Sequence, residues 1–194
     1  MRFHDRLLST IPFFAAIACV AGIVHIASVL AMPAVAPQDA LTRLAAAARA
    51  GEGVVLLPPA SPGREIMPYE DPSVALGVCR FDLSRGFFRV RTSTDGEHYI
   101  ALSFHTRSGR VFYATTDRSA LRGKINVAIV NAAQLEGLEA TDPEDEPPPE
   151  LRLLAPGPIG FVLVRALAER PNELPKAEAR VTAVTCAPEG SPQS

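Results

Sequence analysis

The 194-residue sequence is poor in the residues on which several classes of protein depend. It has no Trp, three Cys and four His, and its 19 Lys and Arg nearly balance 21 Asp and Glu. Three Cys are too few for a disulfide-rich scaffold or a zinc ribbon. A net charge of −2 provides no basic surface for nucleic acid, so we expect no nucleic-acid partner. A hydrophobic share of 47% is too high for a disordered chain.

Catalytic and cofactor-binding motifs are also absent from the sequence. It contains no G-x-S-x-G elbow, no H-E-x-x-H helix, no C-x-x-C pair and no P-loop. We therefore expect no catalytic residue, no metal and no cofactor. The sequence favours a protein that is not an enzyme, and it does not identify a ligand.

The N-terminal stretch has no charged side chain from Leu7 to Gln38. Its apolar core, residues 11–32, would form a helix roughly 30 Å long, which is the thickness of the hydrocarbon layer of a bilayer. A helix of this length in a soluble core would need a polar face. We predict that residues 1–36 form a cytoplasmic tip and an uncleaved transmembrane anchor.

A cleaved signal peptide is the alternative to an anchor. Ala34-Val35-Ala36 is a small-x-small cleavage site, but the apolar run is far longer than the usual h-region of about 7–15 residues. Pro37 directly after the cut would block cleavage, and Cys19 fits a lipoprotein signal only in part. Both alternatives export the residues that follow Pro37.

The charges around the apolar run predict the orientation of the chain. Arg2 and Arg6 favour a cytoplasmic N-terminus, although Arg43 and Arg49 follow the run and weaken this bias. In a bacterium this gives a single-pass inner-membrane protein with a periplasmic C-terminal domain. His25 falls within the membrane, where an imidazole needs a partner helix. That contact either has a function or is a neutral imidazole hydrogen-bonded to a neighbouring backbone.

The sequence after residue 36 predicts a stalk followed by a mainly β, sandwich-like domain. Residues 37–73 begin with helix formers and continue as a proline-rich linker. Residues 74–188 alternate short runs of Val, Ile, Phe and Tyr with Gly, Ser and Asp turns, and residues 189–194 predict a disordered tail. The predicted strands are residues 54–57, 74–83, 87–91, 98–104, 110–115, 124–131, 150–155, 160–167 (with a helix as the alternative) and 177–186.

Three short sequences in this domain predict hairpin turns, Ser84-Arg85-Gly86, Asp95-Gly96 and Ser108-Gly109. We predict that residues 134–150 form a polar connection between two strands. Its second half, residues 142–150, is acidic and rich in proline and is therefore expected to be extended and mobile.

Cys79 and Cys186 are the two cysteines outside the apolar run. In an oxidising periplasm they can form a disulfide, which would fasten the last predicted strand to the first long one. In the chain-entropy model such a bridge contributes about 4–5 kcal/mol. The alternative is two buried thiols, and the sequence does not give the distance between them.

Charge is distributed unevenly along the β domain. Nine basic and four acidic residues lie between residues 75 and 125, whereas residues 126–150 hold seven acids and no base. One interpretation is an arginine-lined face that receives an anionic group such as a lipid headgroup or a glycan carboxylate. The alternative is that the acidic segment or solvent covers this face.

Five residues are the candidate ligand-binding set: Arg80, Asp82, His105, Asp117 and Arg118. The neighbouring pairs Arg80 with Asp82 and Asp117 with Arg118 also fit ion pairs that stabilise the fold. His105 also fits a surface histidine at the end of a strand. The odd spacing of His98 and His105 places them on opposite faces of one predicted strand, so they cannot chelate a metal together.

Several stretches of the sequence resemble the domain-of-unknown-function family 1254 in its short, membrane-anchored proteobacterial form. The resembling stretches are His25-Ile26, Val29-Leu30, Leu57-Pro58-Pro59, Asp71-Pro72, Val78-Cys79-Arg80-Phe81-Asp82-Leu83, Arg89-Val90-Arg91, Ser103-Phe104, Phe112-Tyr113, Thr116-Asp117-Arg118, Gln134-Leu135, Glu144-Asp145 and Gly160-Phe161-Val162-Leu163-Val164-Arg165. The resemblance covers almost the whole chain. It implies a β-sandwich-like domain, which longer relatives follow with a second β domain of family 1214, and it provides no catalytic residue.

These observations lead to a first hypothesis of a non-enzymatic, single-pass inner-membrane protein that serves as a subunit or accessory factor of an envelope complex. Its expected partners are the lipid bilayer and another membrane protein, which in the resemblance would carry the family 1214 half. The second hypothesis is a periplasmic ligand-binding or hydrolytic module that uses the Arg/His/Asp set. A structural spacer is the third.

Overall fold

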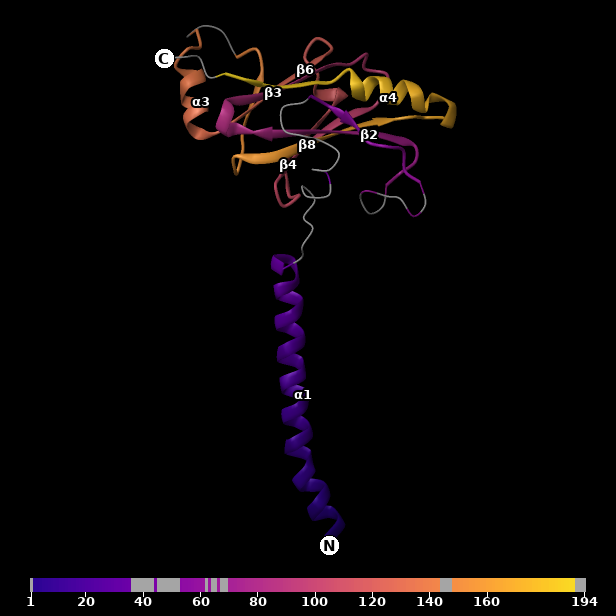
Figure 1. Ribbon diagram of the computed structural model, residues 1–194, viewed down its shortest axis with the longest axis vertical. Coiled ribbons are helices and arrows are strands. Elements are labelled where there is room, and N and C mark those ends of the chain that lie inside the picture. The colour runs from indigo at the N-terminus through magenta and orange to yellow at the C-terminus, as the bar shows by residue number, and fades with distance from the viewer. Residues whose placement is uncertain are drawn as a thin grey trace. The chain divides into compact units, whose positions relative to one another are not determined.

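The structure is a computed structural model that describes residues 2–35, 44, 53–61, 63, 66, 70–143 and 148–190. The chain divides into two compact units, Met1–Pro37 and Gln38–Ser194, which we describe separately (Figure 1).

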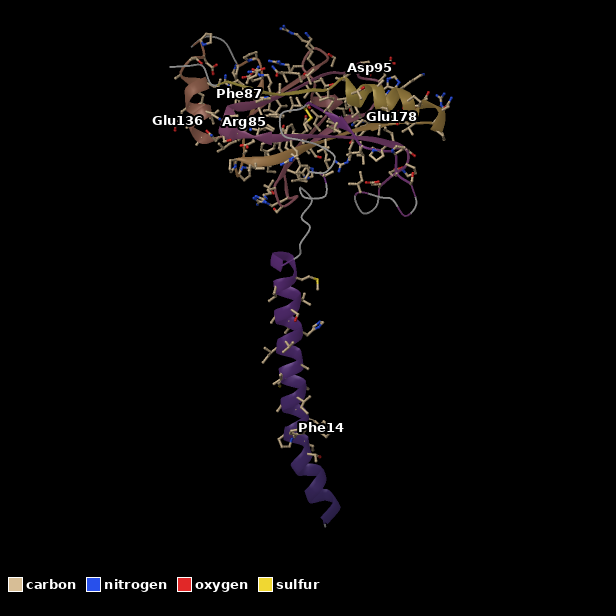
Figure 2. The ribbon with its side chains drawn as sticks, in the orientation of Figure 1. Phe14, Arg85, Phe87, Asp95, Glu136 and Glu178 are labelled. Carbon is tan, nitrogen blue, oxygen red and sulfur yellow. A yellow bond between two sulfur atoms is a disulfide. The ribbon has the colours of Figure 1, made fainter. Side chains whose placement is uncertain are left out.

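The first unit is a single helix, α1 (Arg2–Val35). Its 23-residue stretch Thr10–Met32 is long and apolar enough to cross a membrane, and none of it is buried against protein. At 1.5 Å per residue this stretch is about 34 Å long, enough for the hydrocarbon layer. Large apolar side chains project outward from the helix, and Phe14 is 65% exposed (Figure 2). The predicted apolar helix is therefore present, and a signal sequence near the N-terminus would have the same features.

Two mostly antiparallel sheets make up the second unit, which confirms the predicted helix followed by a β-rich domain. The strands of the first sheet are, in spatial order, β1 (Val55–Leu56), β2 (Val74–Asp82), β8 (Ile159–Leu167), β4 (Ile100–Thr106) and β5 (Val111–Thr116). Those of the second sheet are β7 (Leu151–Leu154), β6 (Lys124–Val130), β3 (Phe87–Ser93) and β9 (Thr185–Glu189). Among the strands of the described residues, β6 and β7 are the one pair that runs in parallel.

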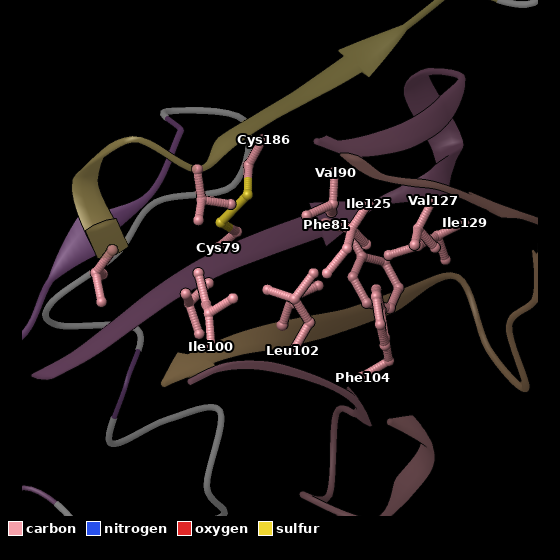
Figure 3. Packing of buried hydrophobic residues seen from close by; sticks show 14 of the residues in the cluster. Cys79, Phe81, Val90, Ile100, Leu102, Phe104, Ile125, Val127, Ile129 and Cys186 are labelled. Atoms are coloured by element: carbon pink, nitrogen blue, oxygen red, sulfur yellow. A yellow bond between two sulfur atoms is a disulfide. The ribbon is translucent and has the colours of Figure 1, made fainter. Parts of the chain in front are cut away.

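The hydrophobic core lies between the two sheets (Figure 3). Alternate residues of each strand point into it, as the two-residue period of a strand requires. Phe81 and Phe104 enter from the first sheet and Phe88 from the second, and each is at most 1% exposed. Burying side chains of this size contributes roughly 1.5–3 kcal/mol each.

A disulfide joins the two sheets through this core. Cys79 of β2 is bonded to Cys186 of β9, with 6.3 Å between their Cα atoms and a sequence separation of 107. The pairing that the sequence left open is therefore formed, and Figure 3 shows it beside the buried side chains.

The outer face of the first sheet is also covered. Leu44 and Leu57 are buried in a second cluster with Val78, Phe161 and Leu163. Residues from the predicted stalk and linker thus belong to the packed domain. Apart from Leu44, which is helical and fully buried, the helix predicted at residues 37–50 lies outside the described residues.

The strand predicted at residues 177–186 is wrong for most of its length. The chain forms helix α4 (Leu174–Thr182) and only then strand β9. Pro175 lies in the first turn, where proline is tolerated, and Ala177 and Val181 are buried four residues apart on one helical face. The alternation of Ala and Val with polar residues conceals this helical spacing.

The polar connection predicted after residue 134 contains a second unpredicted helix, α3 (Ala132–Glu139). Asn131 and Gln134 form a reciprocal capping box at its start, with N···O distances of 2.8 and 3.0 Å. The helix belongs to the crossover that the parallel strands β6 and β7 require. Leu138 packs with Phe87 and covers part of the outer face of the second sheet.

Two of the three predicted hairpin turns are wrong. Ser84-Arg85-Gly86, with the 3₁₀ turn η1 (Leu83–Arg85), leads from β2 to β3, and Asp95-Gly96 leads from β3 to β4. Both connections therefore pass from one sheet to the other. Ser108-Gly109 alone of the three closes a hairpin, between β4 and β5. Two further 3₁₀ turns are η2 (Asp117–Ser119) and η3 (Pro171–Glu173).

A change of Gly160 to Ala is expected to destabilise the domain. Gly160 lies in β8 between β2 and β4, and a Cβ there would overlap the carbonyl oxygen of His105 and the ring of Phe81. Overpacking of this kind costs roughly 1–3 kcal/mol or more. Gly157→Ala is the control, because its Cβ would have no neighbour within 4 Å. Denaturant unfolding of both variants measures the difference, and equal stabilities would contradict the packing described here.

Candidate functional site

The structure brings two of the five predicted ligand-binding residues to one row of the first sheet. In the β2–β8 pairing Arg80 lies opposite Phe161, and in the β8–β4 pairing His105 lies opposite the same residue. Arg80 and His105 therefore flank Phe161 on the outer face of this sheet.

The other three predicted residues lie elsewhere. The Asp82 carboxylate accepts the Ser84 backbone N–H at 3.0 Å and caps η1. Hydrogen bonds from Ser84 hold the pKa of Asp82 below its usual range. Asp117 and Arg118 are in η2, which directly follows β5. The last residue of β5, Thr116, pairs with Ala101 near the start of β4, whereas His105 lies near the end of β4. Asp117 and Arg118 are therefore at the opposite end of β4 from His105.

His105 is the centre of a buried polar network. It is 7% exposed and stacks on the Phe161 ring, with 4.7 Å between ring centroids and 7° between planes. Its Nδ1 lies 3.0 Å from the carbonyl oxygen of Gly109. Because a carbonyl only accepts, Nδ1 carries a proton and donates it to this bond. Burial is the main cause that lowers the pKa of His105, so the ring is neutral at pH 7.

Ser103 and Arg165 complete the network. With Nδ1 protonated and the ring neutral, Nε2 accepts the Ser103 hydroxyl proton across 2.9 Å. Arg165 Nη1 donates to the same Ser103 oxygen at 2.9 Å. Neither residue is among the candidate residues predicted from the sequence. The Ser103-x-His105 spacing, which puts two polar side chains on one face of a strand, is the signal that would have found Ser103.

A hydroxyl, a neutral imidazole and an orienting carbonyl also occur in this order in hydrolases that activate a serine. Ser103 is only 6% exposed, however, and neither hollow described below is lined by it. Its oxygen also accepts a hydrogen bond from Arg165 Nη1, which occupies one of its two lone pairs. We therefore assign the network to the satisfaction of buried polar groups.

The neutral state of His105 predicts that acid destabilises the domain. The pKa of His105 is lower in the folded state than the unfolded value of 6.5. As the pH falls below 6.5, the unfolded chain therefore binds more protons at this residue than the folded chain does. The contribution of His105 is therefore complete above pH 6.5 and is lost as the pH falls through the folded-state pKa. We expect unfolding free energies at pH 7.5 and pH 5.5 to differ less in His105→Gln than in the unmodified protein. An unchanged difference would contradict a neutral, buried ring.

The outer face of the second sheet carries a ladder of ion pairs. Arg89 pairs with Glu150, and its Nε lies 2.9 Å from Glu189. Glu189 also accepts from Arg91 at 2.8 Å. Arg89 lies over the Phe87 ring, 5.2 Å from its centroid. Glu189, which the sequence assigned to a disordered tail, is thus held by two arginines.

Arg152 extends this ladder to the acidic segment. It donates to Asp142 at 2.7 Å and to Glu150 at 3.4 Å. Hydrogen bonding to Arg152 lowers the pKa of Asp142, and the same bonds raise the pKa of Arg152. Glu150, at one end of the acidic segment, therefore contacts Arg89 of the basic stretch, whereas the partner of Asp142 is Arg152, which lies outside that stretch. Residues 144–147 lie outside the described residues.

The connection between β3 and β4 carries a second histidine contact. Asp95 Oδ1 accepts the backbone N–H groups of Glu97 and His98, and its Oδ2 lies 2.7 Å from His98 Nδ1. These bonds, led by the His98 backbone N–H, lower the pKa of Asp95 to about 2. His98 precedes β4, so the expectation that it shares a strand with His105 is wrong.

Two open hollows lie on the surface of the domain. The hairpin hollow, of about 470 Å³, lies between the β4–β5 turn and the β7–β8 connection, and its lining is Thr106, Arg107, Ser108, Arg110, Pro156, Gly157, Pro158 and Ile159. The second-sheet hollow, of about 430 Å³, is lined by Arg91, Thr92, Ser93, Lys124, Ile125, Asn126, Ala183 and Thr185. In the part of the chain that the structure describes, no group of three or more His, Cys, Asp or Glu side chains is placed to hold a metal ion.

Two solved structures are similar to part of this chain. No family model matches the sequence, and no curated protein matches it. The VPA0106 protein from Vibrio parahaemolyticus is 12% identical, with a TM-score of 0.48 over 66% of this chain and 32% of that one. An uncharacterised protein from Burkholderia cenocepacia is 14% identical, with a TM-score of 0.40 over 68% of this chain and 33% of that one. The chain thus spans about a third of the length of these two structures.

Proposed function

We propose that this protein is a single-pass inner-membrane protein of bacteria, with a cytoplasmic N-terminus and a periplasmic β domain, and that it serves as a non-enzymatic subunit or accessory factor of an envelope complex. The observation that carries the proposal is the coexistence of an apolar helix with no charged side chain over Thr10–Met32 and a disulfide in the unit that follows it. Disulfides persist in oxidising compartments such as the periplasm. Arg2 and Arg6 before the apolar stretch support a cytoplasmic N-terminus.

The partner in this proposal is a second membrane protein that contacts the helix at His25. A lipid tail offers no hydrogen bond, so an imidazole within the hydrocarbon layer is stabilised when a neighbouring helix supplies a donor or an acceptor. Gly22 and Val29 lie on the same helical face as His25, at spacings of three and four residues. Small residues allow helices to approach closely. The family 1254 resemblance suggests a partner that carries the family 1214 half.

Photocrosslinking from α1 tests the partner. A photoreactive amino acid in place of Val29, on the His25 face, is expected to give an adduct with a second membrane protein in intact cells. Ile23 is the control position, because it lies about 200° around the helix from His25 and is also exposed. We expect the His25→Leu change to abolish the adduct and to leave the unfolding of the β domain unchanged. Equal adducts from both positions, or none from either, would contradict the proposed contact.

A further inference from the structure

The connection from β5 to β6 ends in an exposed turn that carries apolar and basic side chains. Leu121 is 81% exposed, the largest exposed fraction among the large apolar side chains of the described residues. Arg118, Arg122 and Lys124 lie within three residues of Leu121 in the sequence, and all three are exposed. We call these four residues the basic tip.

The backbone of the basic tip is fixed before a partner arrives. The Leu121 N–H donates to the Lys124 carbonyl at 2.9 Å, and the Lys124 N–H donates to the Leu121 carbonyl at 3.0 Å. The turn is also tied to the end of β3, because the Thr94 N–H donates to the Gly123 carbonyl at 2.9 Å. A turn held in this way loses less conformational entropy on binding than a free loop does.

Arg122 adopts a backbone conformation that arginine rarely takes. Its φ of 53° makes it the one non-glycine residue with a positive φ in the part of the chain that the structure describes. Gly123 follows with a φ of 72°, so both central residues of the turn have the sign that a type I′ turn requires. Asn is common at the first of these positions because it tolerates the left-handed region. An arginine there keeps a cation at the apex of the turn at a cost in backbone strain, which favours a role for its charge.

The three cations of the basic tip are available to a partner. No carboxylate of the described residues forms an ion pair with Arg118, Arg122 or Lys124. Asp117 directly precedes Arg118, and with this acid counted, residues 117–124 still carry a formal charge of +2. The tip therefore presents uncompensated positive charge beside an exposed leucine.

The neighbouring β3–β4 connection adds an exposed aromatic residue. Tyr99 is 47% exposed and directly precedes β4, whose start pairs with the end of β5. Tyrosine is enriched where proteins meet a membrane interface, because its ring is apolar and its hydroxyl is polar. The connection also carries two exposed acids, Asp95, which is bonded to His98, and Glu97. Glu97 opposes contact with an anionic surface, so its removal is expected to strengthen such a contact.

The length of the chain keeps the domain close to a bilayer when α1 is its anchor. Eight residues separate Val35, the last residue of α1, from Leu44, which is buried in the domain. A segment of this length spans at most about 30 Å in any orientation of the two units. Tethering raises the effective concentration of the domain at the bilayer, so a weak contact is enough to dock it.

We propose that the basic tip docks on the anionic phospholipids of the membrane that holds α1, with Leu121 among the lipids and the three cations beside the phosphate groups. The proposal rests on the proposed function, because the anchor provides the tether. Each cation near an anionic lipid surface raises the ratio of docked to undocked domain about fivefold. A stable protein interface buries about 800 Å² on each partner, more than one exposed turn supplies, so lipid is the better occupant.

The absence of Trp from the sequence makes this contact measurable by fluorescence. The full-length Leu121→Trp variant is placed in nanodiscs of phosphatidylcholine and phosphatidylglycerol, with a brominated phosphatidylcholine as the quencher of Trp near the acyl chains. We expect a blue-shifted, quenched emission that is reversed by salt and is much weaker in discs of phosphatidylcholine alone. Val111→Trp is the control, because Val111 is 52% exposed at the other end of β5, and its emission is expected not to change.

Two charge variants, each made in the Leu121→Trp chain, separate docking from folding. Arg122→Asn removes a cation and suits the left-handed turn, so we expect an unchanged or higher midpoint of thermal unfolding and a docked ratio about fivefold lower. Glu97→Gln removes an exposed acid and is expected to raise the docked ratio. Opposite effects of these two changes are expected of contact with an anionic surface and not of a general loss of structure.

Co-elution of the protein with the nanodiscs separates failure of the anchor from failure of the tip. A chain that does not co-elute would contradict the anchor, and the docking with it. With the chain in the discs, emission that does not respond to phosphatidylglycerol, or equal quenching in Val111→Trp, would overturn the docking and leave the anchor in place. In intact cells, a photoreactive amino acid in place of Leu121 that forms an adduct with a protein would overturn the proposal in favour of a protein partner.

Discussion

Replacing Cys79 and Cys186 together by alanine is expected to lower the free energy of unfolding of the β domain by about 4 kcal/mol. The bridge closes a loop across 107 residues, and loops of about 100 residues contribute about 4.7 kcal/mol in the chain-entropy model. It also joins β2 of one sheet to β9 of the other, so its loss frees the last strand to separate from the core. A small domain has roughly 5–15 kcal/mol of stability, which makes this a large fraction.

Denaturant unfolding with and without a reducing agent measures this effect. The reduced unmodified protein is expected to unfold at nearly the same denaturant concentration as the double variant. Cys19→Ala is the control, since Cys19 is a free cysteine in α1 and its loss leaves the bridge intact. A double variant as stable as the oxidised protein would show that the bridge does not hold the sheets together.

The second large effect is expected from Glu150→Gln, which removes one charge from the ion-pair ladder. The Glu150 side chain is 3% exposed and lies between Arg89 and Arg152. Breaking a buried ion pair costs about 3–5 kcal/mol, because the remaining charge stays buried without its partner. Arg89 keeps Glu189 and Arg152 keeps Asp142, so we expect a smaller loss of about 2–3 kcal/mol.

A double-mutant cycle separates this electrostatic effect from a change of packing. Adding Arg89→Gln to Glu150→Gln is expected to cost less than the sum of the single changes, because the double variant leaves neither charge unpaired. Glu136→Gln on exposed α3 is the matched control and should change stability by less than about 0.5 kcal/mol. Additive losses in the cycle would contradict a direct Arg89–Glu150 pairing.

The β core could be predicted from the sequence because it depends on local alternation. Phe81, Phe88 and Val90 occupy every second position of their strands, and the pattern alone places them inside. The strands of both sheets, apart from β9, were predicted from short runs of Val, Ile, Phe and Tyr between turn residues, and residues 160–167, for which a helix was the alternative, form part of strand β8. The order of strands was not predictable, because a turn such as Asp95-Gly96 does not encode whether the next strand pairs with the previous one or crosses to the other sheet.

The two missed helices have different causes. Leu174, Ala177 and Val181 follow the helical spacing, but alternation of small apolar and polar residues between them also fits a strand. α3 has little apolar surface of its own, and its Asn131-x-x-Gln134 capping box was the available local signal. The Ser103-x-His105 spacing is local, but Arg165 of β8 is 62 residues from Ser103 in the sequence, so no local pattern could reveal its contact with Ser103.

Intact mass measured on fractionated cells tests the membrane anchor most directly. The protein is predicted to remain in the membrane fraction after alkaline extraction with its apolar N-terminal stretch intact, and a protease added to spheroplasts is predicted to digest the β domain while sparing α1. A form cut near Ala36 in the soluble periplasmic fraction would contradict the anchor. The full-length chain in the soluble cytosol would contradict both the anchor and the export of the domain.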